Sequence, residues 1–409
     1  MKVLVFNAGS SSLKYKLLDA AGADHMAPLA EGVVEAIGTE HALLKRNDFR
    51  GHVEQPVEAA AVRDALPLVL DALVGEDAPL SSLDEVDACG HRMAHGGAFF
   101  NCSVPVDDDV IAKIEQVSHL APLHNPSALQ VIDRCRELLP NIQQVVAFDT
   151  AFHQTMPARN YVYPIPYRYY EEHGIRRFGF HGMSHKYVSR RAAQFLGENP
   201  RDLKMITCHL GAGASLAAID HGISMDTTMG YTPLDGVMMG TRSGSVDPAI
   251  ITAIMDKEGL SPAEMDRILN RESGMLGVSG VSGDLRKLKE AVAVGDDRAE
   301  LAYDIFLTSI RRMIGAYFFE LAGVDAIVCT AGVGENDPYA RRLIFRGLEP
   351  CGICIDQERN MTTGKADRII STDDSTVKVL VIPTDEEAEI ARDVVLISEG
   401  VDLSDPYRY

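Results

Sequence analysis

The first nineteen residues, MKVLVFNAGSSSLKYKLLD, carry a clear pattern of apolar and polar positions. An apolar run at Val3–Phe6 breaks at the polar segment Asn7–Ser12, and apolar residues then return at every second position as Leu13, Tyr15 and Leu17. Alternation with a period of two is typical of a half-buried strand, so the segment predicts a strand, a tight polar turn and a second strand. By itself this is also the pattern of an ordinary N-terminal hairpin.

The predicted turn has a composition suited to anions. Gly9 gives backbone N–H groups close access to a ligand, and the hydroxyls of Ser10 and Ser12 can add hydrogen bonds. Lys14 supplies a positive charge, and the side-chain oxygen of Asn7 suits a hydrated divalent cation. We therefore interpret the segment as a candidate phosphate turn.

The same pattern recurs in the second half of the chain. The stretch KMITCHLGAGASLAAID, Lys204–Asp220, is again an apolar strand, a turn of glycine and small residues, and a second strand. Aligning the Ser-Leu steps places Ser12-Leu13 over Ser215-Leu216. We interpret the recurrence as an internal duplication, in which each of two domains is built on a hairpin that presents small residues to a shared cleft.

Elsewhere, apolar strands alternate with amphipathic helices, which indicates an α/β architecture with ligands at the carboxyl ends of strands. One such strand, Val145–Phe148, delivers Asp149 at its end. The stretch Met156–Tyr170, rich in Pro and Tyr, predicts a boundary near residue 150. We expect an N-terminal domain at 1–150, a C-terminal domain at 151–383, and a helix at about 384–398 that packs back on the first domain.

Two local patterns predict where helices begin. Ser184 is a candidate N-cap, which would leave His181 just outside a positively polarised helix end. Thr384 and Glu387, three residues apart, form a capping-box pattern. Capping would account for Glu387, so Glu386 is the acidic residue expected to point into the cleft.

Composition narrows the function classes. The formal net charge of −20 argues against a nucleic-acid binder, whose affinity comes from an excess of Lys and Arg. No apolar run is long enough to span a bilayer, and the opening MKVLVF lacks a signal-peptide pattern, so we expect a cytoplasmic protein with no membrane partner. The seven cysteines fit reduced, buried thiols, and Cys351 and Cys354 have C-x-x-C spacing without the second pair that a zinc site needs.

Three glycine-containing turns follow predicted strands, at Gly9, at Gly211 and Gly213, and at Gly332 and Gly334. Together they suggest a polyphosphate cradle. The chain has no Walker A motif and no third glycine after Gly211 and Gly213, so the P-loop and Rossmann interpretations are disfavoured.

Two arginines, Arg92 and Arg242, lie in loops rich in glycine. A guanidinium can bind carboxylate or phosphoryl oxygens in bidentate fashion, and the alternative for each arginine is a surface ion pair. His181 and His185 have the spacing of a metal pair, but no H-E-x-x-H motif accompanies them, so zinc is disfavoured.

Motifs of this kind occur in order along nearly the whole chain: Asn7–Lys14, His91-Arg92 with His95–Gly97, Phe148–His153, Gly179–Gly182, His209–Gly211, Gly240–Gly244, Gly332–Asn336 and Pro383–Glu387. In these motifs the sequence resembles the acetate kinases, which belong to the acetate and sugar kinase/Hsp70/actin superfamily. The resemblance implies an α/β fold of two duplicated actin/Hsp70/sugar-kinase-like domains with a central cleft. It also implies reversible, direct in-line transfer of the γ-phosphoryl group of ATP to acetate, giving acetyl phosphate and ADP.

The resemblance further implies Mg²⁺, with Mn²⁺ as an alternative ion, ATP/ADP as co-substrate, and a homodimer formed through the second domain. The long apolar helix expected at Glu300–Leu321 is compatible with such a dimer. Asn7 and Glu386 would hold the metal, and Arg92 would bind the carboxylate of acetate. The remaining implied residues are, for catalysis, Asp149, His181 and Arg242; for the methyl pocket, Met93, Leu123, Phe180 and Pro233; and for the nucleotide, Lys14, His209, Leu210, Gly211, Ala212, Gly213, Asp284, Leu285, Arg286, Gly332, Val333, Gly334, Glu335 and Asn336.

Physical chemistry sharpens one of these roles. Acetate is already an anion near pH 7, so the nucleophile needs no general base, and the task is to hold two anions together. We therefore expect Asp149 to position the metal or an arginine rather than to abstract a proton.

The sequence departs from the common family pattern at three positions. Ala212 stands where Asn is usual and Met183 where Thr is usual, which puts more of the phosphate contacts on backbone donors. Met93 replaces a smaller Val, and we expect it to narrow the acyl pocket in favour of acetate.

Four alternatives stay open at this point. A propionate or butyrate kinase would share the chemistry, and a pyrophosphate-dependent variant is disfavoured because Gly332 and Gly334 leave room for a nucleoside. A non-enzymatic ATP-binding module of the same fold would not need Arg92, Asp149 and Arg242 together. A metallohydrolase built on the histidine pairs is the weakest alternative.

Overall fold

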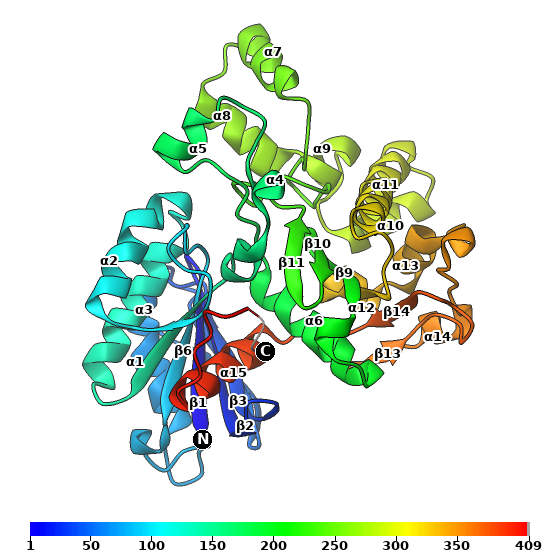
Figure 1. The fold of residues 1–409 in the computed structure, drawn as a ribbon. Coiled ribbons are helices and arrows are strands. Elements are labelled where there is room, and N and C mark those ends of the chain that lie inside the picture. The colour runs from blue at the N-terminus through cyan, green and yellow to red at the C-terminus, as the bar shows by residue number, and fades with distance from the viewer. Residues whose placement is uncertain (407–409) are drawn as a thin grey trace. The chain divides into compact units, whose positions relative to one another are not determined.

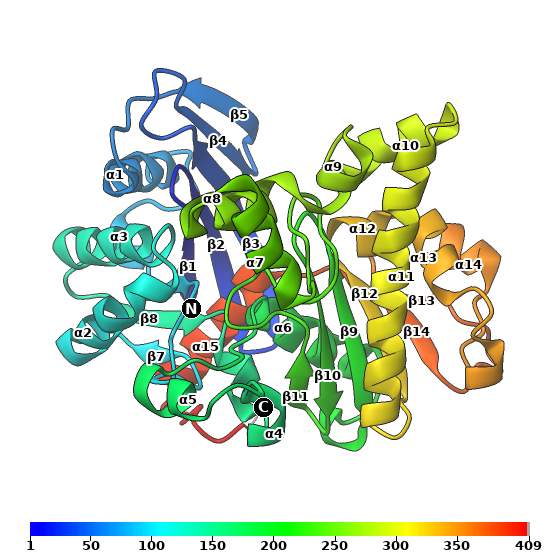
Figure 2. The ribbon, with the colours of Figure 1, turned by 90° about the horizontal axis from the view of Figure 1, so that it is seen from above.

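The computed structural model describes residues 1–406 and divides the chain into two compact units, drawn in Figures 1 and 2. Unit 1 contains Met1–Gln154 and the segment that begins at Asp385, and unit 2 contains Thr155–Thr384. No helix in the described part of the chain combines the length and the apolar composition that crossing a membrane requires.

Unit 1 is built on one sheet with the strand order β5-β4-β3-β2-β1-β6-β8-β7. β1 pairs antiparallel with β2 and parallel with β6, which runs parallel to β8. The strands are β1 (Lys2–Ala8), β2 (Leu13–Gly22), β3 (His25–Glu35), β4 (Leu43–Asp48), β5 (Gly51–Pro56), β6 (Ala88–Met93), β7 (Val104–Pro105) and β8 (Gln143–Phe148).

Helices cover both faces of this sheet. On one face, α1 (Val62–Leu73) and α3 (Asn125–Leu138) share an apolar core with β1 and β2, and α2 (Asp108–Val117) packs against α3. On the other face lies α15 (Glu386–Ser398), where a Cβ on Gly90 would come within 2.6 Å of Ile390. Because side chains alternate along a strand, Arg92 shares the α15 face with Gly90.

Unit 2 is built on a second sheet with the order β11-β10-β9-β12-β14-β13. Its strands are β9 (Lys204–Leu210), β10 (Ala214–Asp220), β11 (Ile223–Thr227), β12 (Ala326–Thr330), β13 (Arg368–Ile369) and β14 (Lys378–Val381). Its helices are α4 (Ala158–Tyr161), α5 (Arg168–His173), α6 (Gly182–Leu196), α7 (Pro248–Glu258), α8 (Pro262–Arg267), α9 (Gly274–Ser279), α10 (Leu285–Ala293), α11 (Asp297–Glu320), α12 (Ala331–Asn336), α13 (Pro338–Phe345) and α14 (Gln357–Met361). α11 joins an apolar core with β9 and β10, and α6 packs on β9 and β12.

The predicted duplication is confirmed by the sheets. The order β3-β2-β1-β6-β8 in unit 1 matches β11-β10-β9-β12-β14 in unit 2, with the same parallel and antiparallel pairs. The turns differ in length, because Ala8 pairs with Leu13 but Leu210 pairs with Ala214. At equal distance from the turn, Ser215 therefore corresponds to Lys14 and not to Ser12, so the predicted alignment is wrong by two residues.

Two predicted helix starts are wrong. α6 begins at Gly182, and His181 takes the N-cap position in a left-handed conformation with φ of 57°, so Ser184 lies inside the first turn. α15 is capped by Asp385, whose side chain accepts from the N–H of Ala388, and not by Thr384.

The third glycine turn also differs from the expectation. Residues Ala331–Asn336 form the short helix α12 rather than an open turn, and Ala331 has a left-handed φ of 62°. The chain thus passes directly from the end of β12 into a helical turn. Asp337 caps the next helix, α13, where its side chain accepts from the N–H of Ala340.

Candidate active site

In unit 1, the guanidinium of Arg92 is the centre of a polar cluster at the ends of β1, β6 and β8. Its Nε donates to Asp149 Oδ1 at 3.1 Å, its Nη2 forms a close ion pair with Asp149 Oδ2, and its Nη1 donates to Asn7 Oδ1 at 3.2 Å. Two parallel hydrogen bonds to one carboxylate fix the plane of a guanidinium. The carboxylate of Asp149 therefore fixes the orientation of the Arg92 guanidinium.

Glu386, the first residue of α15, belongs to the same cluster. Burial raises the pKa of Glu386 to about 7, the charge of Asp149 adds to this effect, and Arg92 opposes it. Burial by itself lowers the pKa of Arg92, but the neighbouring charges of Asp149 and Glu386 outweigh burial and raise it. The guanidinium of Arg92 is thus charged at neutral pH. A further cation beside Glu386 would lower the pKa of its carboxyl group and favour the ionised form.

The oxygen atoms of this cluster fit a hard divalent cation. Asn7 supplies an amide oxygen and Glu386 and Asp149 supply carboxylates, which are the donors that Mg²⁺ prefers. Within residues 1–406, no group of three or more His, Cys, Asp or Glu side chains forms a complete metal cage. That arrangement suits an ion that takes its other ligands from water and a substrate phosphate.

The phosphate turn of unit 1 is closed by a hydrogen bond from the N–H of Gly9 to the carbonyl of Ser12 at 2.8 Å. A Cβ on Gly9 would lie 3.0 Å from Ser12 Oγ, so glycine keeps the turn tight. Ser10 is exposed and Ser12 is half-buried. Lys14 pairs with Asn7 across the β1–β2 ladder and lines a cavity of about 530 Å³.

Two residues predicted to form the methyl pocket, Met93 and Leu123, do not lie in the surroundings that the prediction expects. Met93 is fully buried in the apolar core that includes Phe148, on the opposite face of β6 from Arg92. Leu123 is 58% exposed. The prediction that Met93 narrows the acyl pocket is therefore not supported by its position, because strand alternation turns its side chain away from Arg92.

In unit 2, His181 and Arg242 meet at the turn between β9 and β10. A Cβ on Gly213 would lie 3.4 Å from Arg242 Nη1 and 3.6 Å from His181 Nε2. Glycine at this position therefore leaves space in front of both groups. Burial lowers the pKa of Arg242.

The ring of His209 stacks on His181, with ring centroids 4.1 Å apart and planes 16° apart. His209 Nδ1 lies 2.8 Å from the hydroxyl of Ser184, which also lies 2.9 Å from the hydroxyl of Thr384. Burial lowers the pKa of His209 to about 4. His209 therefore supports His181 with a neutral ring at pH 7.

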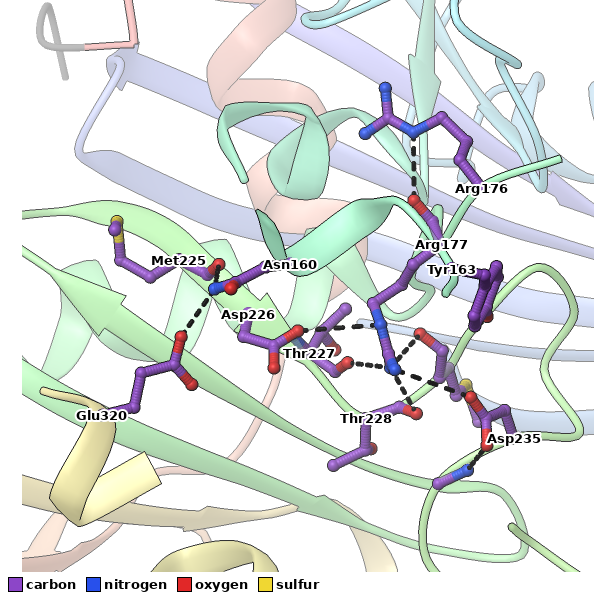
Figure 3. A network of polar contacts seen from close by, with 12 residues as sticks. Asn160, Tyr163, Arg176, Arg177, Met225, Asp226, Thr227, Thr228, Asp235 and Glu320 are labelled. Carbon is purple, nitrogen blue, oxygen red and sulfur yellow. Dashed lines mark hydrogen bonds and ion pairs between the residues drawn. The ribbon is translucent and has the colours of Figure 1, made fainter. Parts of the chain in front are cut away.

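Arg242 is held by the segment that follows β11. Its Nη1 donates to the carbonyl of Pro233 at 3.2 Å. Figure 3 shows how the start of this segment is fixed by Arg177, whose Nη1 donates to the carbonyls of residues 227, 228 and 229 at 2.6, 3.0 and 3.4 Å. One guanidinium thus contacts three consecutive carbonyls. Arg177 itself lies four residues before His181 in the sequence.

Two carboxylates and a tyrosine complete this network. Asp226 and Asp235 each lie 3.7 Å from the guanidinium of Arg177, and the hydroxyl of Tyr163 accepts from the N–H of Tyr231 at 2.9 Å. Burial raises the pKa of Asp226 to about 6, against the lowering effect of Arg177. The network therefore holds a carboxylate that changes charge close to neutral pH.

Unit 2 also contains a cavity of about 930 Å³. Residues from three separate stretches of the chain line it: Gly211, Ala212, Met275, Gly283, Asp284, Leu285, Arg286, Lys289, Gly332, Val333, Asn336 and Asp337. A Cβ on Gly332 would meet no atom within 4 Å, so this glycine leaves the cavity open. The volume is in the range of sites for small organic ligands.

Several predicted nucleotide residues do not line this cavity. Glu335 uses its carboxylate internally, accepting from the N–H groups of Ala331 at 2.8 Å and Thr384 at 3.2 Å. Gly334 packs against the end of β12, where a Cβ would lie 3.3 Å from the backbone of Cys329. His209 and Leu210 end β9, and Gly213 lies in the turn between β9 and β10. Lys14 belongs to unit 1.

Comparison with known proteins covers almost the whole chain. The sequence profile of the Acetokinase family matches residues 2–392. The chain is 50% identical over 404 residues to the acetate kinase of Caldanaerobacter subterraneus subsp. tengcongensis, which covers 98% of this chain and 100% of the relative. The chain belongs to the acetokinase family.

Solved structures agree with this assignment. The acetate kinase of Porphyromonas gingivalis is 44% identical, with a TM-score of 0.93 over 97% of this chain and 99% of that one. A propionate kinase from Francisella tularensis subsp. tularensis SCHU S4 is 38% identical, with a TM-score of 0.88 over 96% and 98% of the two chains. Membership of the acetokinase family makes the chain a kinase with a carboxylate acceptor and with ATP or ADP as co-substrate.

Sequence reasoning missed part of what the acetokinase fold brings to the site. Lys289 and Asp337 line the cavity and form an ion pair of 2.9 Å, and neither is among the candidate site residues of the sequence analysis. Arg177 lies next to a recognised motif, but its partners are backbone carbonyls fifty residues further along. Ser215 had been identified only as part of a repeat. No local sequence pattern distinguishes these residues, because their partners are distant in the chain.

Proposed function

We propose that this chain catalyses the reversible transfer of the γ-phosphoryl group of ATP to acetate, giving acetyl phosphate and ADP. The observation that carries the proposal is the pair of prearranged guanidinium groups, Arg92 held by Asp149 and Asn7, and Arg242 held by the carbonyl of Pro233. The main task of this reaction is to bring two anions together, and guanidinium groups fixed in advance serve it without a reorganisation cost.

Arg92 binds the carboxylate of acetate. Its Nε and Nη2 are directed at Asp149 and its Nη1 at Asn7, which leaves one N–H on each terminal nitrogen for a second carboxylate. Asp149 orients Arg92 and takes no proton, since acetate is ionised at neutral pH. The nucleophilic oxygen therefore reaches the phosphorus as an anion already in place.

His181 and Arg242 stabilise the transferring phosphoryl group. In phosphoryl transfer, negative charge spreads over the equatorial oxygens, and donors placed beside them lower the barrier. Gly213 leaves the space in front of His181 Nε2 and Arg242 Nη1 in which such oxygens fit. His209 backs His181 without adding charge.

The cavity of unit 2 binds the nucleotide. Gly332, Val333, Asp284 and Arg286 form its walls, and the phosphates extend toward Gly211 and Ala212. Asn7 and Glu386, with Asp149 nearby, would hold Mg²⁺, and Mn²⁺ would suit the same oxygen atoms. When bound, the ion neutralises phosphate charge.

Acetate is the acceptor that we propose, and propionate is the competing one, because relatives of both kinds resemble this chain. Phe180 and Pro233 are the candidate residues for contact with the methyl group, since Met93 faces the core and Leu123 is exposed. One methylene is worth only about 1–3 kcal/mol in an apolar pocket, so preference rather than exclusion is expected.

We further propose a cytoplasmic homodimer formed through unit 2. Large apolar side chains are exposed on or beside α7 and α11: Val246, Ile250, Leu301, Ile305 and Phe319. Phe319 alone is 84% exposed. Burial of such side chains against a second copy would be favourable.

The test is the formation of acyl phosphate, trapped as the hydroxamate, from ATP and Mg²⁺ with acetate, propionate or butyrate. A parallel set replaces ATP with pyrophosphate. The proposal predicts fast turnover that needs ATP and is most efficient with acetate. Higher kcat/KM for propionate would overturn the choice of acceptor, and no acyl phosphate from any pair would overturn the kinase assignment itself.

A further inference from the structure

A chain of hydrogen-bonded side chains runs from the core of unit 2 to the half-buried His181. Thr207 Oγ1 lies 2.7 Å from His185 Nδ1, His185 Nε2 lies 2.8 Å from Ser215 Oγ, and Ser215 Oγ lies 2.9 Å from His181 Nδ1. Thr207, His185 and Ser215 are all 0% exposed. Ser215 thus lies within hydrogen-bond distance of both histidines.

Counting protons restricts the arrangement of this chain. The hydroxyl of Ser215 has one proton, so it can donate to His181 or to His185 but not to both. A neutral imidazole has one N–H group. If Ser215 donates to His181, then His185 donates to Ser215 and Thr207 donates to His185, and the proton of His181 is on Nε2. If Ser215 instead donates to His185, or accepts from both rings, a neutral His181 has its proton on Nδ1.

The two directions give His181 different chemistry at the glycine turn. His181 Nε2 is the atom near Gly213, beside Arg242 Nη1. With a proton on Nε2, the neutral ring donates a hydrogen bond to an anion there. With the proton on Nδ1, the neutral ring directs a lone pair at the same anion, which is repulsive.

We propose that Ser215, supported by His185 and Thr207, is a positioning residue that holds His181 in the Nε2–H tautomer and fixes its ring plane. Both the choice of the Nε2–H tautomer and its role in catalysis rest on the function proposed above, but the tautomer is measured without substrate. Removing Ser215 leaves Nδ1 of His181 without this hydroxyl donor and releases the choice of tautomer.

The position of Ser215 in the fold supports this assignment. It pairs with His209 across the β9–β10 ladder, at the depth where Lys14 pairs with Asn7 in unit 1. In unit 1 this position carries a cation on the strand surface. In unit 2 it carries a fully buried hydroxyl that acts through the histidine beside it.

The experiment is ¹⁵N NMR of the histidine rings in the full-length protein without ligands, with the His181 signals assigned by His181→Gln. The variants are Ser215→Ala and Thr207→Val, which removes only the distal hydroxyl and keeps the shape. Ser189→Ala is the matched control, because Ser189 is a buried serine on α6 whose hydroxyl donates to the carbonyl of Lys186 at 3.0 Å.

We expect His181 to be mainly the Nε2–H tautomer in the wild type and in Ser189→Ala, and to become a mixture in Ser215→Ala. Thr207→Val should shift the mixture in the same direction by less. In the kinetic assay, Ser215→Ala should lower kcat by about 10- to 100-fold, as loss of a supporting hydrogen bond does at other sites, with KM values changed less than about twofold.

A wild-type His181 protonated on Nδ1, or a tautomer ratio that neither Ser215→Ala nor Thr207→Val changes, would overturn the proposal. These readouts need no substrate. If the wild type makes no acyl phosphate while the tautomer responds to Ser215, the proposed function fails and the inference about Ser215 stands.

Discussion

The two units share one sheet topology but carry opposite chemistry at corresponding places. In unit 1 the helix on the sheet, α15, begins with Glu386, and the strands below it present Asn7, Arg92 and Asp149 as an ionic cluster. In unit 2 the corresponding helix, α6, begins beside His181, and the site is made of imidazole rings, hydroxyls and glycines with one arginine.

This difference shows how a duplicated fold can divide the work of one reaction. Hard oxygen donors and a fixed guanidinium suit a metal ion and a small carboxylate. Glycine turns and neutral hydrogen-bond donors suit a phosphoryl group whose own charge is already large.

Removal of Arg242 should have the largest effect. Arg242→Ala is expected to lower kcat by about 10³-fold or more, by analogy with other arginines that stabilise phosphoryl transfer. The assay is hydroxamate trapping at saturating ATP and acetate. Arg191→Ala is the control, since Arg191 forms an exposed ion pair with Asp367, and a loss below tenfold for Arg242→Ala would contradict its role.

Neutralising Asp149 should lower activity without adding a titrating limb to the pH–rate profile. Asp149→Asn loses the ion pair that orients Arg92, and we expect kcat/KM for acetate to fall by about 10- to 100-fold. Because the charge of Asp149 helps to raise the pKa of Glu386, any limb due to Glu386 should move to lower pH in the variant. A new titrating limb in the variant would indicate that Asp149 acts as a base, against this account.

The hydrogen bonds from Arg177 to the carbonyls of residues 227–229 should affect the rate less than the groups that contact substrate. Arg177→Lys keeps the charge but loses the planar fork whose Nη1 reaches the carbonyls of residues 227–229 while Nε faces Asp226 and Nη2 faces Asp235. We expect kcat to fall by about tenfold as Pro233 and Arg242 lose their fixed position. Circular dichroism should show an unchanged fold. Equal activity in the variant and the wild type would remove Arg177 from the site.

Asp226 should affect stability rather than rate. Its pKa in the folded protein is about 6, above the usual value of 3.8, so its contribution to stability is full below about pH 3.8 and is lost as pH rises through about 6. Asp226→Asn has no such loss. The Tm difference, variant minus wild type, should therefore increase by about 3 °C between pH 4 and pH 7.5, and a difference that stays flat would contradict the burial effect.

Much of this architecture could be predicted from the sequence because its signals are local. The alternation after Asn7, the end of the strand before Asp149 and the recurring hairpin each need only neighbouring residues. The left-handed conformation of His181 could not be predicted, since it moves the start of α6 without any change in periodicity. The buried position of Met93 depends on the face of β6 that packs against the core.

The polar networks were the part that sequence could not supply. Ser215, Arg177 and Glu335 are ordinary polar residues in their local context, and each gains its role from a partner far away in the chain. A family motif also does not tell which of its residues line the cavity. Gly332 lines it, whereas Glu335 supports the neighbouring backbone.

The division of labour is tested most directly by the KM values for both substrates in two matched variants, Arg92→Lys in unit 1 and Gly332→Leu in unit 2. Arg92→Lys should raise KM for acetate by about tenfold or more and leave KM for ATP unchanged, because it removes a charged bidentate donor. Gly332→Leu fills open space in the cavity and should raise KM for ATP alone, whereas Gly332→Ala should change little. If Arg92→Lys acted on ATP or Gly332→Leu on acetate, the two units would not divide the substrates as proposed.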